Sequence, residues 1–130
     1  MLKWYEEEDI VKYAYDLVEA MRTGLFTYIC HPDHFLLCVK SWNSNCEKAA
    51  RIIFEEAQRL GVPLEINNLG LRQHRPYPSE EFFRLSKEYN LKYVIGMDAH
   101  DPKNFSKENV EKEFEFLKKF DIEPIDLKIK

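Results

Sequence analysis

The chain has few cysteines, and no two of them are closely spaced. Cys30, Cys38 and Cys46 are an odd number at eight-residue spacing, with no CxxC motif. This pattern argues against the disulfide framework of a small secreted domain and fits a reduced chain. The first ten residues, MLKWYEEEDI, are acidic and lack the apolar stretch of a secretory leader. We therefore predict a cytoplasmic protein.

Long apolar runs and blocks of like charge are missing as well. No run approaches the roughly 20 residues that a membrane-spanning helix needs. Acidic and basic residues are mixed along the chain and the formal net charge is −4, so the basic surface of a nucleic-acid-binding protein is not expected. We expect partners that include neither membranes nor nucleic acids. A small anionic ligand is compatible with this composition.

The sequence does contain enough apolar material for one packed core. Of its 130 residues, 45% are hydrophobic and 14% aromatic, with no internal repeat or linker. Helical periods alternate with short apolar runs. The expected helices cover residues 6–22, 46–60, 79–89 and 107–120, and the expected strands cover residues 26–30, 62–67 and 91–96. Residues 1–130 are therefore predicted to form a single domain.

The alternation of helices and strands predicts an α/β fold, in which crossover helices connect parallel strands. With a short apolar run at residues 125–127, the chain offers about three to four parallel strands. Four strands at most are too few to close an eight-stranded barrel. The chain is therefore predicted to form part of a barrel, and an exposed sheet edge makes a homo-oligomer a further expectation.

Polar side chains collect where the expected strands end, which is where α/β proteins build their sites. His31 and His34 follow the first strand in HPDHF, and Asp98 and His100 follow the third in GMDAH. Asp98 and His100 are two positions apart, so they share a face of an extended segment. Imidazole with carboxylate suits Zn, Mn or Fe(II), and these two side chains can therefore face one metal ion.

The second strand ends in Glu65-Ile66-Asn67, whose first and last side chains likewise share a face. Arg72 and Arg75 lie in the polar stretch that follows, residues 68–78, where they are placed to hold an anion. Each group also has a bland alternative: a turn histidine, a half-buried carboxylate that orders nearby loops, or solvated arginines. Their conjunction at one edge of a parallel sheet favours a site.

Three segments carry a resemblance to a known family: YICHPDHF, PLEINNLGLRQHRPYPSEEF and YVIGMDAH. Together they resemble the polymerase-and-histidinol-phosphatase (PHP) superfamily and, within it, the histidinol-phosphate phosphatase branch. The resemblance covers nearly the whole chain. It implies the carboxy-terminal part of a distorted (βα)7 barrel with a trinuclear centre of Zn, Mn or Fe ions. It also implies hydrolysis of a phosphate monoester, L-histidinol phosphate, in histidine biosynthesis.

The resemblance also implies roles for particular residues. His31, Asp98 and His100 would be metal ligands, with Asp98 and His100 at the catalytic centre. Arg72 would bind the substrate phosphate, and Asn67 would line the pocket.

The sequence departs from the family in one respect. The family opens with an HxH motif on its first strand, and no HxH occurs in this sequence. The amino-terminal half of the barrel is therefore expected to be absent, and the chain alone is expected to show little or no phosphatase activity. Two alternatives stay open: a phosphoesterase with another phosphorylated substrate, or a non-catalytic protein that self-associates. No role carries over to His34 or Arg75.

Overall fold

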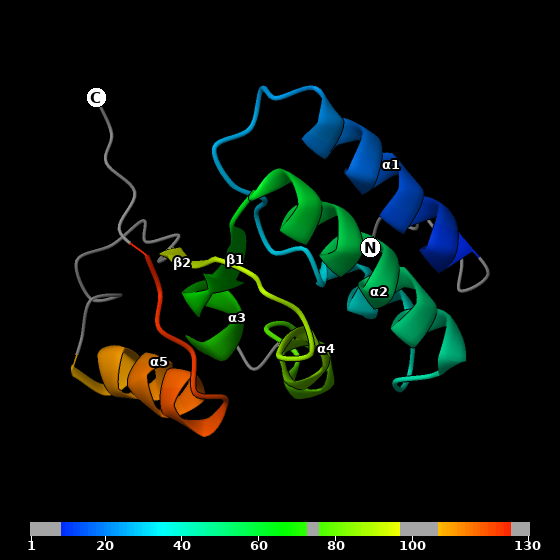
Figure 1. Cartoon of the computed structure of the whole chain (residues 1–130). Coiled ribbons are helices and arrows are strands. Elements are labelled where there is room, and N and C mark those ends of the chain that lie inside the picture. Colours follow the sequence, from blue (N-terminus) through cyan, green and yellow to red (C-terminus); the bar gives the residue numbers. More distant parts are fainter. Residues whose placement is uncertain (1–8, 73–75, 97–106, 126–130) are drawn as a thin grey trace.

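A computed structural model describes residues 9–72, 76–96 and 107–125 and shows a mixed α/β fold (Figure 1). All four predicted helices occur where they were predicted. Two short helical segments, one of them the 3-10 helix η2, were not predicted. The elements are α1 (Ile10–Arg22), η2 (His34–Cys38), α2 (Ser44–Leu60), β1 (Leu64–Asn67), α3 (Asn68–Arg72), α4 (Glu80–Ser86), β2 (Tyr93–Gly96) and α5 (Lys107–Lys119).

The two central helices have well-defined ends. At the start of α2, the Asn43 side chain accepts hydrogen bonds from the backbone N–H groups of Asn45 and Cys46. Gly61 ends α2 in the left-handed conformation, at φ 70°. The Ser79 hydroxyl accepts a hydrogen bond from the Phe82 N–H at the start of α4. These caps fix where α2 begins and ends and where α4 begins.

The described residues form a sheet of two parallel strands. β1 pairs with β2 so that Leu64 lies opposite Tyr93 and Asn67 opposite Gly96. The expected strand at residues 26–30 contributes only a single parallel bridge, from Ile29 to Leu64. The prediction of three to four strands is therefore wrong for the part of the chain that the structure describes. Ile29 itself is buried, but the residues that lead into it form an exposed loop. Among the described strands this segment pairs with β1 alone, so little burial holds the rest of it extended.

The polar stretch at residues 68–78 begins with a helix that was not predicted. The helix α3 starts directly after β1, at Asn68. Buried Asn68 anchors it, because its Nδ2 lies within hydrogen-bond distance of the Asn109 carbonyl oxygen and the Glu113 carboxylate on α5. A five-residue helix with a central glycine has little intrinsic helical tendency, so this tertiary anchor holds it.

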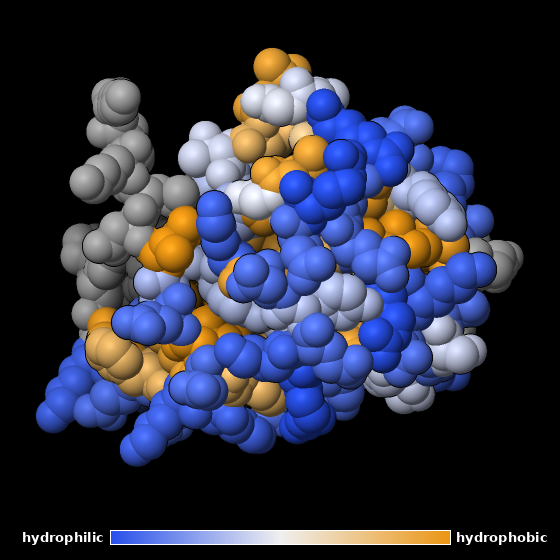
Figure 2. Space-filling model, in the orientation of Figure 1, coloured by the Kyte–Doolittle hydropathy of each residue, from blue (hydrophilic) through white to orange (hydrophobic). Residues whose placement is uncertain are grey.

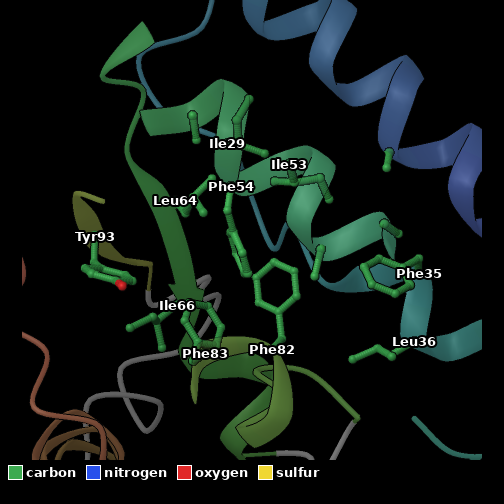
Figure 3. Close-up of a cluster of buried hydrophobic side chains, with 14 of the residues drawn as sticks. Ile29, Phe35, Leu36, Ile53, Phe54, Leu64, Ile66, Phe82, Phe83 and Tyr93 are labelled. Carbon is green, nitrogen blue, oxygen red and sulfur yellow. The ribbon is translucent and has the colours of Figure 1, made fainter. Parts of the chain in front are cut away.

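The core lies between the sheet and the helices that cover it. In Figure 1, α1 runs beside α2, and α4 lies below α2. Figure 3 shows the centre of this core, where aromatic rings from α2 and α4 meet aliphatic side chains of β1. Its fully buried members include Phe54, Phe82, Phe83, Leu64 and Ile66.

Hydrophobic side chains also reach the surface after α1. Figure 2 shows apolar surface over the loop that follows this helix, where Leu25 is 82% exposed and Phe26 is 52% exposed. No helix within the described ranges has both the length and the apolar composition to cross a bilayer.

Candidate functional site

The candidate site begins at His31, directly after the bridge to β1. His31 has φ 24°, a left-handed backbone conformation that is unfavourable for a residue with a Cβ. Its backbone N–H donates to Glu65 Oε1 at 2.9 Å, and its carbonyl accepts the His34 N–H at 3.0 Å. Two hydrogen bonds thus hold the strained turn in place.

Glu65 and Asn67 share a face of β1, as their spacing predicts. Asn67 Nδ2 donates to Glu65 Oε1 at 2.9 Å, the same oxygen that accepts the His31 N–H. Glu65 is only 4% exposed and Asn67 3% exposed. The Glu65 carboxylate is therefore buried, rather than half-buried, and accepts hydrogen bonds from two neighbouring residues.

Two buried polar atoms of this cluster have no hydrogen-bond partner among the described residues: His31 Nδ1 and Asn67 Oδ1. Buried polar atoms without a hydrogen-bond partner are rare in folded proteins, because the free-energy cost of removing them from water is not compensated by a new hydrogen bond. An imidazole nitrogen and an amide oxygen are also metal-ligand atoms. Each atom is therefore chemically able to serve as a ligand atom.

Three rings, those of His31, His34 and Tyr77, lie close together and are tilted relative to one another. The His31 and His34 rings lie 4.7 Å apart between centroids, and Tyr77 lies 5.5 Å from His31 and 5.3 Å from His34. Tyr77 is buried, and it comes from the segment between α3 and α4. Sequence reasoning missed this residue as a site component. The signal that could have found it is its position between Pro76 and Pro78, since two prolines restrict the backbone there.

Asp33 ties the same segment to the histidine turn. It is 1% exposed, and its Oδ2 accepts the Ser79 N–H at 2.6 Å. Burial raises the pKa of Asp33 from 3.8 to about 7; the hydrogen bond from Ser79 opposes this change and the nearby Glu65 charge adds to it. Sequence reasoning missed Asp33, because an aspartate in a turn is usually exposed.

The close approach of two backbones brings these parts together. A Cβ on Gly70 of α3 would lie 2.7 Å from the Tyr77 carbonyl carbon and would overlap its oxygen. Only glycine leaves room for the Tyr77 backbone at this position. Gly70 thereby allows the Tyr77 ring to reach the two histidines.

Not all of the predicted site residues can be located. Asp98 and His100, and also Arg75, lie outside the described residues. Arg72 is the last residue of α3, two positions after Gly70. Its backbone is described, but its side chain is not. Of the predicted set, the structure brings together His31 and Asn67 around Glu65. The assignment of Asp98 and His100 as catalytic and metal-binding residues, and of Arg72 as the phosphate-binding residue, stays a prediction.

Within the described part of the chain, no three His, Cys, Asp or Glu side chains are arranged to hold a metal ion. His31 is the one predicted metal ligand that lies inside that part. The observation that supports a cation at this edge is the partnerless His31 Nδ1, together with two buried carboxylates, Asp33 and Glu65. No described lysine or arginine side chain pairs with either carboxylate.

Asp33 should make the stability of the protein depend on pH. Because its folded-state pKa is raised to about 7, the folded state holds this proton between about pH 4 and pH 7 while the unfolded chain has lost it. The free energy of unfolding should therefore fall as the pH rises through this window. Asp33→Asn keeps an acceptor for the Ser79 N–H and should remove most of this fall.

Urea unfolding at pH 5 and pH 7.5, followed by circular dichroism, measures the effect. Asp16→Asn is the matched control, since Asp16 is exposed and forms a surface ion pair with Lys12 across one helical turn. An unchanged pH dependence in Asp33→Asn would show that the Asp33 carboxyl does not titrate in this window.

Searches of protein-family models, of curated proteins and of solved structures find no match to this chain.

Proposed function

We propose that the chain forms part of a divalent-metal site that hydrolyses phosphomonoesters, with L-histidinol phosphate as the substrate. The observation that carries this proposal is the partnerless His31 Nδ1, in a turn whose backbone N–H is bound by the buried Glu65 carboxylate. A buried, ionised carboxylate without a cationic partner is costly, and a bound cation would offset the charge of Glu65. The PHP-like segments supply the identity of the reaction.

Each residue would have a distinct task. Divalent ions, when bound, polarise a phosphoryl oxygen and lower the pKa of a coordinated water. His31 would bind one ion through its free nitrogen, and Asp98 and His100 are the further ligands proposed. Arg72 would hold the phosphate with two parallel hydrogen bonds, which a planar guanidinium favours. Asn67 would line the pocket, with its free Oδ1 available to accept a hydrogen bond.

We also propose that the two-stranded sheet is part of a larger (βα)7-type barrel, and that the protein acts in the cytoplasm. The Ile29 segment supports the first point. In a parallel bridge to Leu64, both backbone groups of Ile29 face β1, so those of Tyr28 and Cys30 face the other way. This edge, with exposed Leu25 and Phe26 before it, is where another strand or a second copy of the chain would add.

Metal binding and phosphate release, measured on one preparation, test the proposal. We expect the purified chain to bind Mn²⁺ weakly, because a few ligands cannot enclose each ion of a multi-metal site. His31→Ala should weaken that binding about tenfold or more, whereas His34→Ala is the matched control from the same turn and should retain it. Mn²⁺ affinity is read from electron paramagnetic resonance. Equal affinities in wild type and His31→Ala would contradict the assignment.

Phosphate release from L-histidinol phosphate in the presence of Mn²⁺ or Zn²⁺ should be close to background for the chain alone. Clear turnover that His31→Ala abolishes would mean that an assembly of chains completes the site, and light scattering would reveal that assembly. A panel of phosphomonoesters distinguishes L-histidinol phosphate from other substrates. Binding of neither metal nor phosphate ester, with a mass that grows with concentration, would favour the non-catalytic, self-associating alternative.

A further inference from the structure

We infer that Glu65 is a positioning residue, whose buried carboxylate sets the orientation of both His31 and Asn67 at the carboxyl edge of the sheet. The inference rests on the proposed function, since it assigns Glu65 to the same metal site. It adds a residue to which neither the resemblance nor the predicted ligand set gives a role.

The hydrogen bonds of Glu65 are the first observation. One oxygen, Oε1, accepts both the His31 backbone N–H and the Asn67 side-chain N–H, each at 2.9 Å. Hydrogen bonds to a carboxylate are stronger than those between neutral groups. By binding Nδ2 of Asn67, Glu65 fixes which way the amide faces and leaves Oδ1 free. The two orphaned site atoms therefore belong to residues that the same carboxylate holds.

The strained backbone of His31 is the second observation. A non-glycine residue at φ 24° persists only where its surroundings over-determine it. The Glu65 carboxylate supplies one of the two hydrogen bonds that His31 makes through its backbone. Loss of that bond would let the turn relax, and the imidazole would move with it.

The space around Glu65 is the third observation. A Cβ on Gly96 of β2 would lie 2.5 Å from Glu65 Cδ and closer still to Oε2. Gly96 lies opposite Asn67 in the sheet register, so the carboxylate reaches across to the neighbouring strand. Because glycine has no side chain, it leaves room for the Glu65 carboxylate at this position. Glu65 thus joins the histidine turn, β1 and the end of β2, two residues before Asp98.

A second buried glutamate shows what an ordinary structural role looks like. Glu56 on α2 is 7% exposed, and its carboxylate is paired with the guanidinium groups of Arg22 and Arg59. Its charge is neutralised by these side chains, and among the described residues its carboxylate hydrogen-bonds to these two arginines and not to a site residue. Glu65 has no such partner among the described lysines and arginines, and both donors it holds are site residues. Glu56 is therefore the matched control.

The test combines nuclear magnetic resonance of the metal-free chain with Zn²⁺ titration by calorimetry. In Glu65→Gln, we expect the His31 backbone amide and the Asn67 side-chain amide resonances to shift together, and the Zn²⁺ affinity to fall by about 10–100-fold. Gly96→Ala should do the same with Glu65 intact, because the added methyl group displaces the carboxylate. Glu56→Gln should leave the two resonances and the affinity unchanged.

The outcomes separate this inference from the proposed function. If wild type binds no Zn²⁺, the proposed metal site fails. Positioning by Glu65 is then judged from the metal-free chain, where unshifted His31 and Asn67 resonances in Glu65→Gln would overturn it. If wild type binds Zn²⁺ and both variants bind it equally well, the metal site stands and Glu65 has no positioning role. If Glu65→Gln fails to fold, Gly96→Ala decides between these outcomes.

Discussion

Replacement of Phe82 by alanine should lower the free energy of unfolding by about 3–5 kcal/mol, the usual cost of removing a fully buried phenylalanine ring. Phe82 is 0% exposed, and its ring centroid lies 4.6 Å from that of Phe54 and 5.1 Å from that of Phe83. A third ring, that of Phe35 in η2, lies 6.2 Å away. The truncation would therefore leave a cavity where α2, α4 and η2 meet.

The chain offers a matched control for this substitution. Phe114 on α5 is 63% exposed, so Phe114→Ala should change the free energy of unfolding by no more than about 0.5 kcal/mol. Urea unfolding monitored by circular dichroism compares the two variants. Since small domains are stable by only about 5–15 kcal/mol in total, Phe82→Ala should also lower the urea midpoint by a large fraction. Similar losses in both variants would mean that this aromatic cluster is not the centre of the core.

Gly70→Ala should destabilise the protein even though it places a better helix former inside a helix. Intrinsic propensity alone favours alanine by about 1 kcal/mol. The added Cβ would overlap the Tyr77 carbonyl group, which is backbone and cannot turn aside as a side chain could. Overpacking of this kind typically costs about 1–3 kcal/mol, and more where backbone must move. The sum should be a clear loss of stability.

The same substitution should disturb the candidate site. Displacement of Tyr77 from Gly70 would separate its ring from His31 and His34, so the ring resonances of both histidines should shift. Gly24→Ala is the control, because Gly24 has φ 72° but nothing within 4 Å of an added Cβ. It should cost only the roughly 1–2 kcal/mol of the left-handed conformation and leave the histidine resonances unchanged. A stabilised Gly70→Ala variant would show that the two backbones do not meet as described.

Local signals in the sequence determined the four predicted helices and the parallel pairing of two strands. The apolar stripe of α1, the helical period of α2 and the Ser79 cap of α4 each depend on residues a few positions apart, so single-sequence reasoning could find them. The face shared by Glu65 and Asn67 also followed, because alternation along a strand needs no knowledge of its neighbours.

Tertiary structure alone decided the remaining features, because each depends on a partner far along the chain. The segment around Ile29 is reduced to one bridge because, of the elements that the structure describes, β1 alone pairs with it. The short helix α3 exists because Asn68 is anchored to α5, more than 40 positions away. Asp33 is buried where its carboxylate accepts the Ser79 N–H. Glu65 accepts the N–H of His31, which is 34 positions away in the sequence. Residue types and spacing can identify candidate site residues, but only the packed chain determines which carboxylate supports which histidine.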